Sequence, residues 1–195
     1  MRRPRIFRWA AMVGLVGLMA LAGVPMAAAK PSQCRVINNG KFTTLQAAQD
    51  AASAGDTLQV HGMCTGTTTI DKNLTVTGKP DSSTPTLDGG EQGTVLTIVQ
   101  GVTVTIKRLT ITGGTADTGG GIVNSGTLIL NDSIVSGNTA QSSGGGIENS
   151  GTVTLNGSSA VTGNRAASGN CTESASCFGV GGGIANDQGT VILND

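Results

Sequence analysis

From Asp56 onward, apolar and polar residues alternate along most of the chain. The alternation has a period of two over short segments, which is typical of β-strands with one buried face. Gly and Asn residues that favour tight turns separate these segments. The pattern therefore predicts a succession of short strands whose inward-pointing residues include Leu58, Val60, Ile70, Leu74, Val76, Val102, Val104, Ile106, Leu109 and Ile111.

A different period occurs between Lys41 and Gly55. Thr43 and Gln46 have the spacing of a capping box, which marks the start of a helix, and Gly55 is a favourable residue for its end. The sequence predicts one short helix with a narrow face of small residues, suited to cover the end of a larger structure. Its helical spacing is carried by Phe42, Leu45, Ala48 and Ala51–Ala52.

The strand region contains an internal repeat. The phrase GGGIVNSGTLILNDSIVSGNTAQSS begins at Gly119, returns as GGGIENSGTVTLNGSSAVTGNRAAS at Gly144, and begins again as GGGIANDQGTVILND at Gly181. The first step is 25 residues, and the second is 37, which equals one repeat plus a 12-residue insert. Aligning the copies predicts two columns of equivalent residues: Ile122, Ile147 and Ile184, and Asn124, Asn149 and Asn186.

A repeat of this length with three short strands cannot bury its apolar side chains alone, but it can bury them by stacking on copies of itself. We therefore expect an all-β fold, a right-handed parallel β-helix with a short N-terminal capping helix. Roughly five or six coils would lie about 4.8 Å apart. The isoleucine column would point inward, the asparagine side chains would form a hydrogen-bonded ladder, and the Gly triplets would form corners.

The first 29 residues have the pattern of a secretory signal peptide. Four arginines precede an apolar run from Trp9 to Val24, and Ala27-x-Ala29 supplies a cleavage pattern before Lys30. An uncleaved membrane anchor is the alternative, because the run approaches spanning length. The sequence thus predicts a secreted or cell-envelope protein that keeps no stable membrane span after cleavage.

Three segments are expected: a signal peptide at 1–29, a cap with the first strand at 30–64, and β-helix coils at 65–195. Asp195 aligns with Asp132, in the middle of a coil. We therefore expect either a longer protein in which further coils follow, or an open last coil that self-associates through its unpaired edge.

Cleavage would leave eight basic and twelve acidic residues, a net charge of −4. This balance argues against a nucleic-acid partner, which favours a basic surface. Aromatic residues make up only 2% of the chain, so its core must be aliphatic.

All four cysteines follow the cleavage site, and an even number in an exported chain suggests disulfides. Three pairings are open; we expect Cys34–Cys64, which flanks the N-terminal segment, and Cys171–Cys177, which closes a small loop. A zinc site is disfavoured because CxxC spacing is absent and His61 is the one histidine. His61 itself is interpreted as a solvated turn residue.

Two stretches resemble known families. The segment from Thr43 to Val60 is similar to the N-terminal cap and first coil of the pectin-lyase-like right-handed parallel β-helix proteins, which include pectate lyases. The GGGI phrases resemble half of the repeat of polymorphic outer membrane proteins, which are surface adhesins, although the companion FxxN motif is missing. The resemblance covers residues 42–195 and implies the fold, together with either adhesion or action on polysaccharides.

Candidate catalytic residues are sparse. A calcium-dependent lyase would need clustered acids and a nearby base, and a glycosidase would need two facing carboxylates. Asp88 and Glu91 share one loop, but an exposed turn explains them better. We therefore assign no catalytic, cofactor or metal residues from the remaining candidates, which are spread over different turns: Asp71, Asp81, Asp117, Asp132, Lys72, Lys107 and Arg108.

The insert at residues 168–180 is the one departure from the repeat, and insertions on repeat scaffolds are frequently binding loops. Cys171, Cys177 and Phe178 mark it as the candidate contact loop. The sequence predicts an exported, non-enzymatic, adhesin-like scaffold that contacts surface glycans or proteins. The alternative is a polysaccharide-acting enzyme, or a fragment of one.

Overall fold

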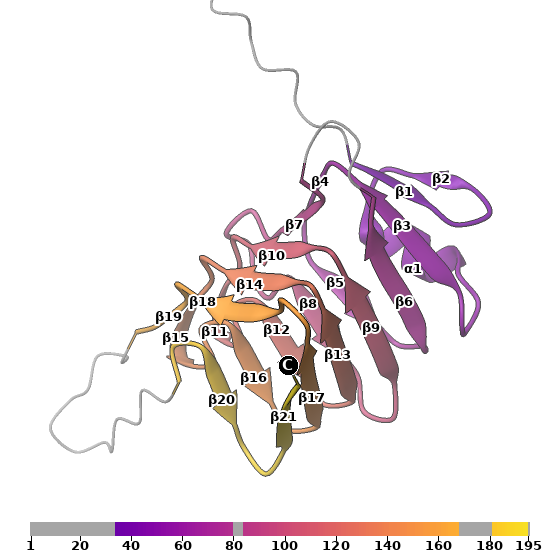
Figure 1. Cartoon of the computed structure of the whole chain (residues 1–195). Helices are drawn as coiled ribbons and strands as arrows, with labels where there is room; N and C mark the ends of the chain where they lie inside the picture. The colour runs from indigo at the N-terminus through magenta and orange to yellow at the C-terminus, as the bar shows by residue number, and fades with distance from the viewer. Residues whose placement is uncertain (1–33, 80–83, 168–180, 195) are drawn as a thin grey trace, which may run out of the picture. The chain divides into compact units, whose positions relative to one another are not determined.

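The computed structural model describes residues 34–79, 84–167 and 181–194, all within the unit Pro31–Asp195 (Figure 1). This part of the chain is a parallel β-helix with one short helix near its N-terminal end, which confirms the predicted fold class. The strands of successive coils lie side by side and form stacked parallel sheets.

The broad sheet contains eight strands among the described residues, in the order β2-β1-β3-β6-β9-β13-β17-β21. From β3 onward all its pairs are parallel, whereas β1 is antiparallel to both β2 and β3. Its strands are β1 (Arg35–Ile37), β2 (Lys41–Phe42), β3 (Thr57–His61), β6 (Leu74–Gly78), β9 (Thr103–Lys107), β13 (Thr127–Asn131), β17 (Thr152–Asn156) and β21 (Thr190–Asn194).

Two further parallel sheets of five described strands each complete the first coils. The second sheet consists of β4 (Met63–Thr65), β7 (Thr86–Asp88), β10 (Thr110–Thr112), β14 (Ile134–Ser136) and β18 (Ala160–Thr162). The third sheet consists of β5 (Thr68–Ile70), β8 (Leu96–Ile98), β12 (Ile122–Asn124), β16 (Ile147–Asn149) and β20 (Ile184–Asn186). The stack begins at β3, because β3 already pairs in parallel with β6.

A fourth sheet appears in the later coils, where the expectation of three strands per repeat is wrong. It is formed by β11 (Thr115–Thr118), β15 (Thr139–Ser143) and β19 (Arg165–Ala166). The sequence of β15, TAQSS, has no apolar alternation. These strands are defined by their parallel backbone pairing, with Ala116 opposite Ala140 and Ala140 opposite Ala166.

The core is a set of aliphatic columns that run through the stack. Every inward position expected from the alternation is at most 8% exposed. Ile122 and Ile147 are fully buried and pair in register, and Ile184 of the last described β20 is half-buried against the same core. One such column on the broad sheet consists of Leu58, Val76, Ile106, Leu130 and Leu155.

Glycine shapes the corner before β12, β16 and β20. Gly119, Gly144 and Gly181 have φ values of 59°, 62° and 68°, which side-chain-bearing residues adopt at a cost. The next corner position is restricted by space instead, because a Cβ on Gly121 would lie only 2.6 Å from the carbonyl oxygen of Gly146. Both reasons for a Gly-rich corner therefore act in the same triplet.

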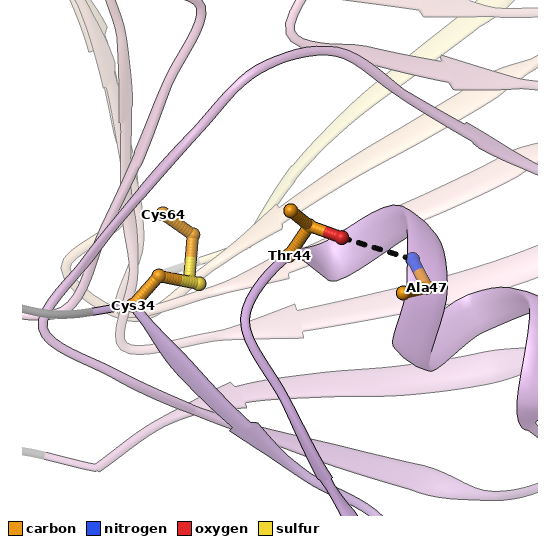
Figure 2. Close-up of a disulfide and its surroundings, with 4 residues drawn as sticks. All are labelled: Cys34, Thr44, Ala47 and Cys64. Carbon is orange, nitrogen blue, oxygen red and sulfur yellow. Dashed lines mark hydrogen bonds between the residues drawn. A yellow bond between two sulfur atoms is a disulfide. The ribbon is translucent and has the colours of Figure 1, made fainter.

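The helix α1 (Leu45–Ala51) packs against β5 and buries Leu45, Ala48 and Gln49. Its N-cap is Thr44, whose hydroxyl accepts a hydrogen bond of 3.2 Å from the backbone N–H of Ala47 (Figure 2). The expected capping box at Thr43 is therefore wrong by one residue. The helix ends at Ala51, with Ala52 as its C-cap, and so ends before Gly55.

Polar contacts join α1 to the first coil. The Gln46 side chain accepts from the backbone N–H of Thr69 (2.8 Å), and the Gln49 side chain donates to Asp71 (2.6 Å). The ammonium group of Lys72 donates to the carbonyl oxygens of Gln49 and Ala52, at 3.0 and 3.3 Å. Lys72 thus satisfies carbonyl groups at the C-terminal end of the helix.

The strands β1 and β2 form an antiparallel hairpin that the sequence pattern does not predict. Its turn contains Asn39 with a φ of 42°, followed by Gly40. The Cys34–Cys64 disulfide joins the residue before β1 to β4, which confirms the first predicted pairing (Figure 2). The expected Cys171–Cys177 pair lies outside the described residues.

Candidate contact surface

Two of the acidic residues considered for catalysis hold turns through their side chains. Asp88 accepts a hydrogen bond from the N–H of Gly90 (2.9 Å), and Asp132 accepts one from the N–H of Ser158 (3.1 Å). Glu91 adopts a positive φ of 60°, and its own N–H donates to the carbonyl of Gly113. The expectation of an exposed turn is wrong for Asp88, which is the half-buried last residue of β7, whereas Glu91 lies exposed in a turn.

The candidate bases lie in two places: Lys107 and Arg108 are adjacent at the end of β9, and Lys72 lies beside α1. Arg108 donates to the hydroxyl of Thr77 (3.0 Å), whereas Lys72 is engaged with α1 and lies 3.7 Å from Asp71. Asp81 lies outside the described residues. Within the residues that the structure describes, no group of three or more His, Cys, Asp or Glu side chains could hold a metal ion.

His61 corrects one expectation, because it is a half-buried residue at the end of β3 and not a solvated turn residue. It lies opposite Arg35 of β1, and Nδ1 of His61 is 3.1 Å from Nη2 of Arg35. Strand pairing at the N-terminal end of the broad sheet thus accounts for its position.

A cavity of about 140 Å³ lies between the start of α1 and the first two coils. The polar groups at its helix side are already engaged, since Thr44 caps the helix and Gln46 binds the N–H of Thr69. The space suits a few water molecules. Its walls are Thr44, Leu45, Gln46, Cys64, Thr65, Gly66, Thr67, Thr68, Leu87, Val95 and Leu96.

The asparagine column forms a hydrogen-bonded ladder. The side-chain N–H of Asn124 donates to Oδ1 of Asn149 (2.7 Å), and that of Asn149 donates to Oδ1 of Asn186 (2.6 Å). Asn124 and Asn149 are fully buried, whereas Asn186 in the last described coil is exposed. The same side chains also hold the adjoining turns, through the backbone of Gly126 and Gly151.

Two more asparagine ladders are present that the sequence pattern did not predict. Asn138 and Asn164 share a hydrogen bond of 3.0 Å, and Asn138 is 1% exposed. On the outward face of the broad sheet, Asn156 donates to Asn131 and Asn194 donates to Asn156, both at 2.8 Å. The signal was present, because both sets occupy equivalent positions in the repeated phrase.

The outward face of the broad sheet carries two adjacent columns of mostly threonine, which we call the threonine face. The first column pairs Thr103, Thr127, Thr152 and Thr190 in register. The second column contains Thr57, Thr75, Thr105, Ile129, Thr154 and Ile192. The alternation that predicts the buried positions of these strands also marks the outward threonines.

The threonine face is uncharged, with Lys107 lying in the next column of the sheet. Among the described residues, none of its eight threonine hydroxyl groups hydrogen-bonds to another protein group. Thr57, Thr103 and Thr190 are exposed, and the other five threonines are half-buried by their neighbours in the columns. The hydroxyl groups are therefore available to an external partner.

Asparagine side chains fix the backbone beneath the first column. The N–H of Thr103 donates to Oδ1 of Asn73 (2.8 Å). The carbonyl of Thr152 accepts from Asn124 (3.0 Å), and the carbonyl of Thr190 accepts from Asn149 (3.3 Å). The buried ladder and the outward face are therefore physically connected.

The helix of the described region is too short and too polar to cross a membrane. The expected contact loop, with Cys171, Cys177 and Phe178, lies outside the described residues. No protein-family model, curated protein or solved structure matches the chain.

Proposed function

We propose that the chain is an exported, non-enzymatic β-helix scaffold that presents a rigid contact surface at the cell surface or outside the cell. The observation that carries this proposal is the threonine face, whose hydroxyl groups are not used inside the described structure. Weak contacts repeated over a rigid surface bind collectively, because the first contact raises the effective concentration of the others.

The structural roles of the remaining polar residues support a scaffold. The side chains of Asp88 and Asp132 hold turns, and the asparagine ladders hold coils to one another. The resemblance of the GGGI phrases to polymorphic outer membrane proteins favours an adhesin-like role, with surface glycans or proteins as partners. The insert at 168–180 is proposed as a second contact element.

Solid-phase binding combined with an activity assay tests this proposal. The purified chain from Lys30 onward is applied to immobilised neutral and acidic polysaccharides, with and without calcium, and the release of sugar products is followed. We expect no turnover with any of these polysaccharides. Turnover that Asp88→Asn abolishes and Asp132→Asn preserves would instead show a polysaccharide-acting enzyme.

Export is tested separately, by the mass of the protein recovered outside the producing cell. Cleavage in the Ala27-x-Ala29 pattern is expected to give a chain that begins at Lys30. Recovery only of the uncleaved chain in the membrane fraction would contradict a secreted scaffold and support the anchor.

A further inference from the structure

The threonine face has two regular spacings. Neighbouring coils place equivalent residues about 4.8 Å apart, and residues two apart along one strand lie about 6.6 Å apart. Thr103 and Thr105 lie two apart on β9, as do Thr152 and Thr154 on β17. Hydroxyl and methyl groups are thus repeated in two directions across the broad sheet, whose strands lie side by side in Figure 1.

The face is also rigid. Threonine is β-branched, so its χ1 rotation is restricted before any partner binds. Asn73, Asn124 and Asn149 hold the backbone of the first column through hydrogen bonds. Ordering the face on binding therefore costs little conformational entropy, which favours a partner that is itself rigid and repeating.

The chemistry of the face narrows the class of partner. An anionic polymer would call for cations along the whole face. Lys107 and Arg108, which donates to Thr77, lie beside only the β6 and β9 end of the two columns, and the next column is uncharged on β13, β17 and β21. A sugar chain would favour aromatic platforms, and neither column contains an aromatic residue. Hydroxyl groups interleaved with methyl groups instead match a neutral lattice of hydrogen-bonding oxygen atoms.

We propose that the threonine face binds the surface of ice crystals, with its hydroxyl groups hydrogen-bonding to oxygen atoms of the ice lattice. The spacing of about 4.8 Å between coils is close to the shorter repeat distance between oxygen atoms in ice. The methyl groups of threonine, Ile129 and Ile192 fill the hollows between water molecules. This inference rests on the proposed scaffold function and names the partner of its contact surface.

The test is ice growth in the presence of the purified chain from Lys30 onward. We expect the wild-type protein to arrest crystal growth below the melting point and to be retained in the ice fraction of a slowly frozen solution. Thr127→Lys, in the middle of the first column, places a flexible charged side chain on the face and is expected to abolish both effects. Thr152→Lys is a second variant of the same kind.

Thr110→Lys is the matched control, because Thr110 is a half-buried outward residue of β10 on the second sheet. It is expected to retain the wild-type effects, and far-UV circular dichroism verifies the fold of each variant. Wild-type protein that does not affect ice growth would overturn the inference, as would equal loss in the control.

Binding to crystalline cellulose and chitin is measured in parallel, to test a polysaccharide surface as the alternative partner. Retention on either solid that Thr127→Lys removes, without an effect on ice, would overturn ice as the partner and show a polysaccharide surface instead. In that case the proposed scaffold function would stand. Failure of the scaffold function would be seen separately, as turnover in the polysaccharide assay.

Discussion

The side chain of Asn124 donates a hydrogen bond of 2.7 Å to Asn149, and both side chains are fully buried. The two residues are 25 positions apart in the sequence and occupy the same position of neighbouring coils. Asn149 in turn donates a hydrogen bond to Asn186, and its side chain also bonds to the backbone of Gly151. Asn149 therefore links three coils through one side chain.

Asn149→Ala is expected to lower the free energy of unfolding by about 2–3 kcal/mol, because it leaves buried partners without hydrogen bonds. Asn186→Ala is the control and should cost less, since water can replace the exposed Asn186 side chain. Urea unfolding followed by circular dichroism measures both variants. Equal losses would contradict the role assigned to the buried ladder.

Thr44→Ala is expected to destabilise the protein by about 1 kcal/mol, the usual cost of removing a helix N-cap. Its hydroxyl satisfies the N–H of Ala47 at the start of α1, which covers the first coil. Thr43→Ala is the neighbouring control and should be nearly neutral. Thermal unfolding compares the two, and the reverse order would restore the capping box expected from the sequence.

Reduction of the Cys34–Cys64 disulfide is expected to lower the free energy of unfolding. The bond closes a loop between residues 30 positions apart, for which the chain-entropy estimate is about 3–4 kcal/mol. The double variant Cys34→Ser with Cys64→Ser should show the same loss in urea without reductant. A wild-type midpoint that reductant leaves unchanged would contradict the prediction.

The pKa of Asp56 lies below its ordinary value of 3.8. The backbone N–H of Ser53 is the larger cause and the side chain of Asn38 the second, while partial desolvation opposes them. The folded-state pKa is depressed, so the stabilisation is present above the unfolded-state pKa and is lost as the pH falls through the folded value.

Asn38→Ala is therefore expected to raise the pKa of Asp56 part of the way to its ordinary value, since the Ser53 bond remains. Carbon NMR titration of the Asp56 carboxyl group measures the change. Asp56→Asn should remove the corresponding part of the acid dependence of stability below about pH 4. Titration of wild-type Asp56 at or above 3.8 would contradict the assignment.

The stacked columns could be predicted because repetition in the sequence becomes register in space. Aligning Ile122 with Ile147 requires only the phase of the repeat, and the alternation then fixes which face each neighbour occupies. The strands β11 and β15 could not be found in this way. Their polar residues pair mainly through the backbone, which leaves no periodic signal.

The other differences between the predicted and the observed structure arise from local geometry. Thr43 and Thr44 are chemically identical candidates for the N-cap, and the choice depends on backbone angles, which are −141° and 154° at Thr44. The hairpin strands of two and three residues are too short to show a period. The alternation in the sequence shows which threonines point outward. Their alignment into columns follows only from the pairing of strands in neighbouring coils.

The pairing of β16 with β20 keeps Ile147 opposite Ile184, although the chain takes 37 residues between them instead of the 25 between Ile122 and Ile147. Twelve additional residues are therefore accommodated without a shift in register. This position is a natural place to graft a foreign peptide, such as an epitope or an affinity tag, and to display it while the coils on either side keep their pairing.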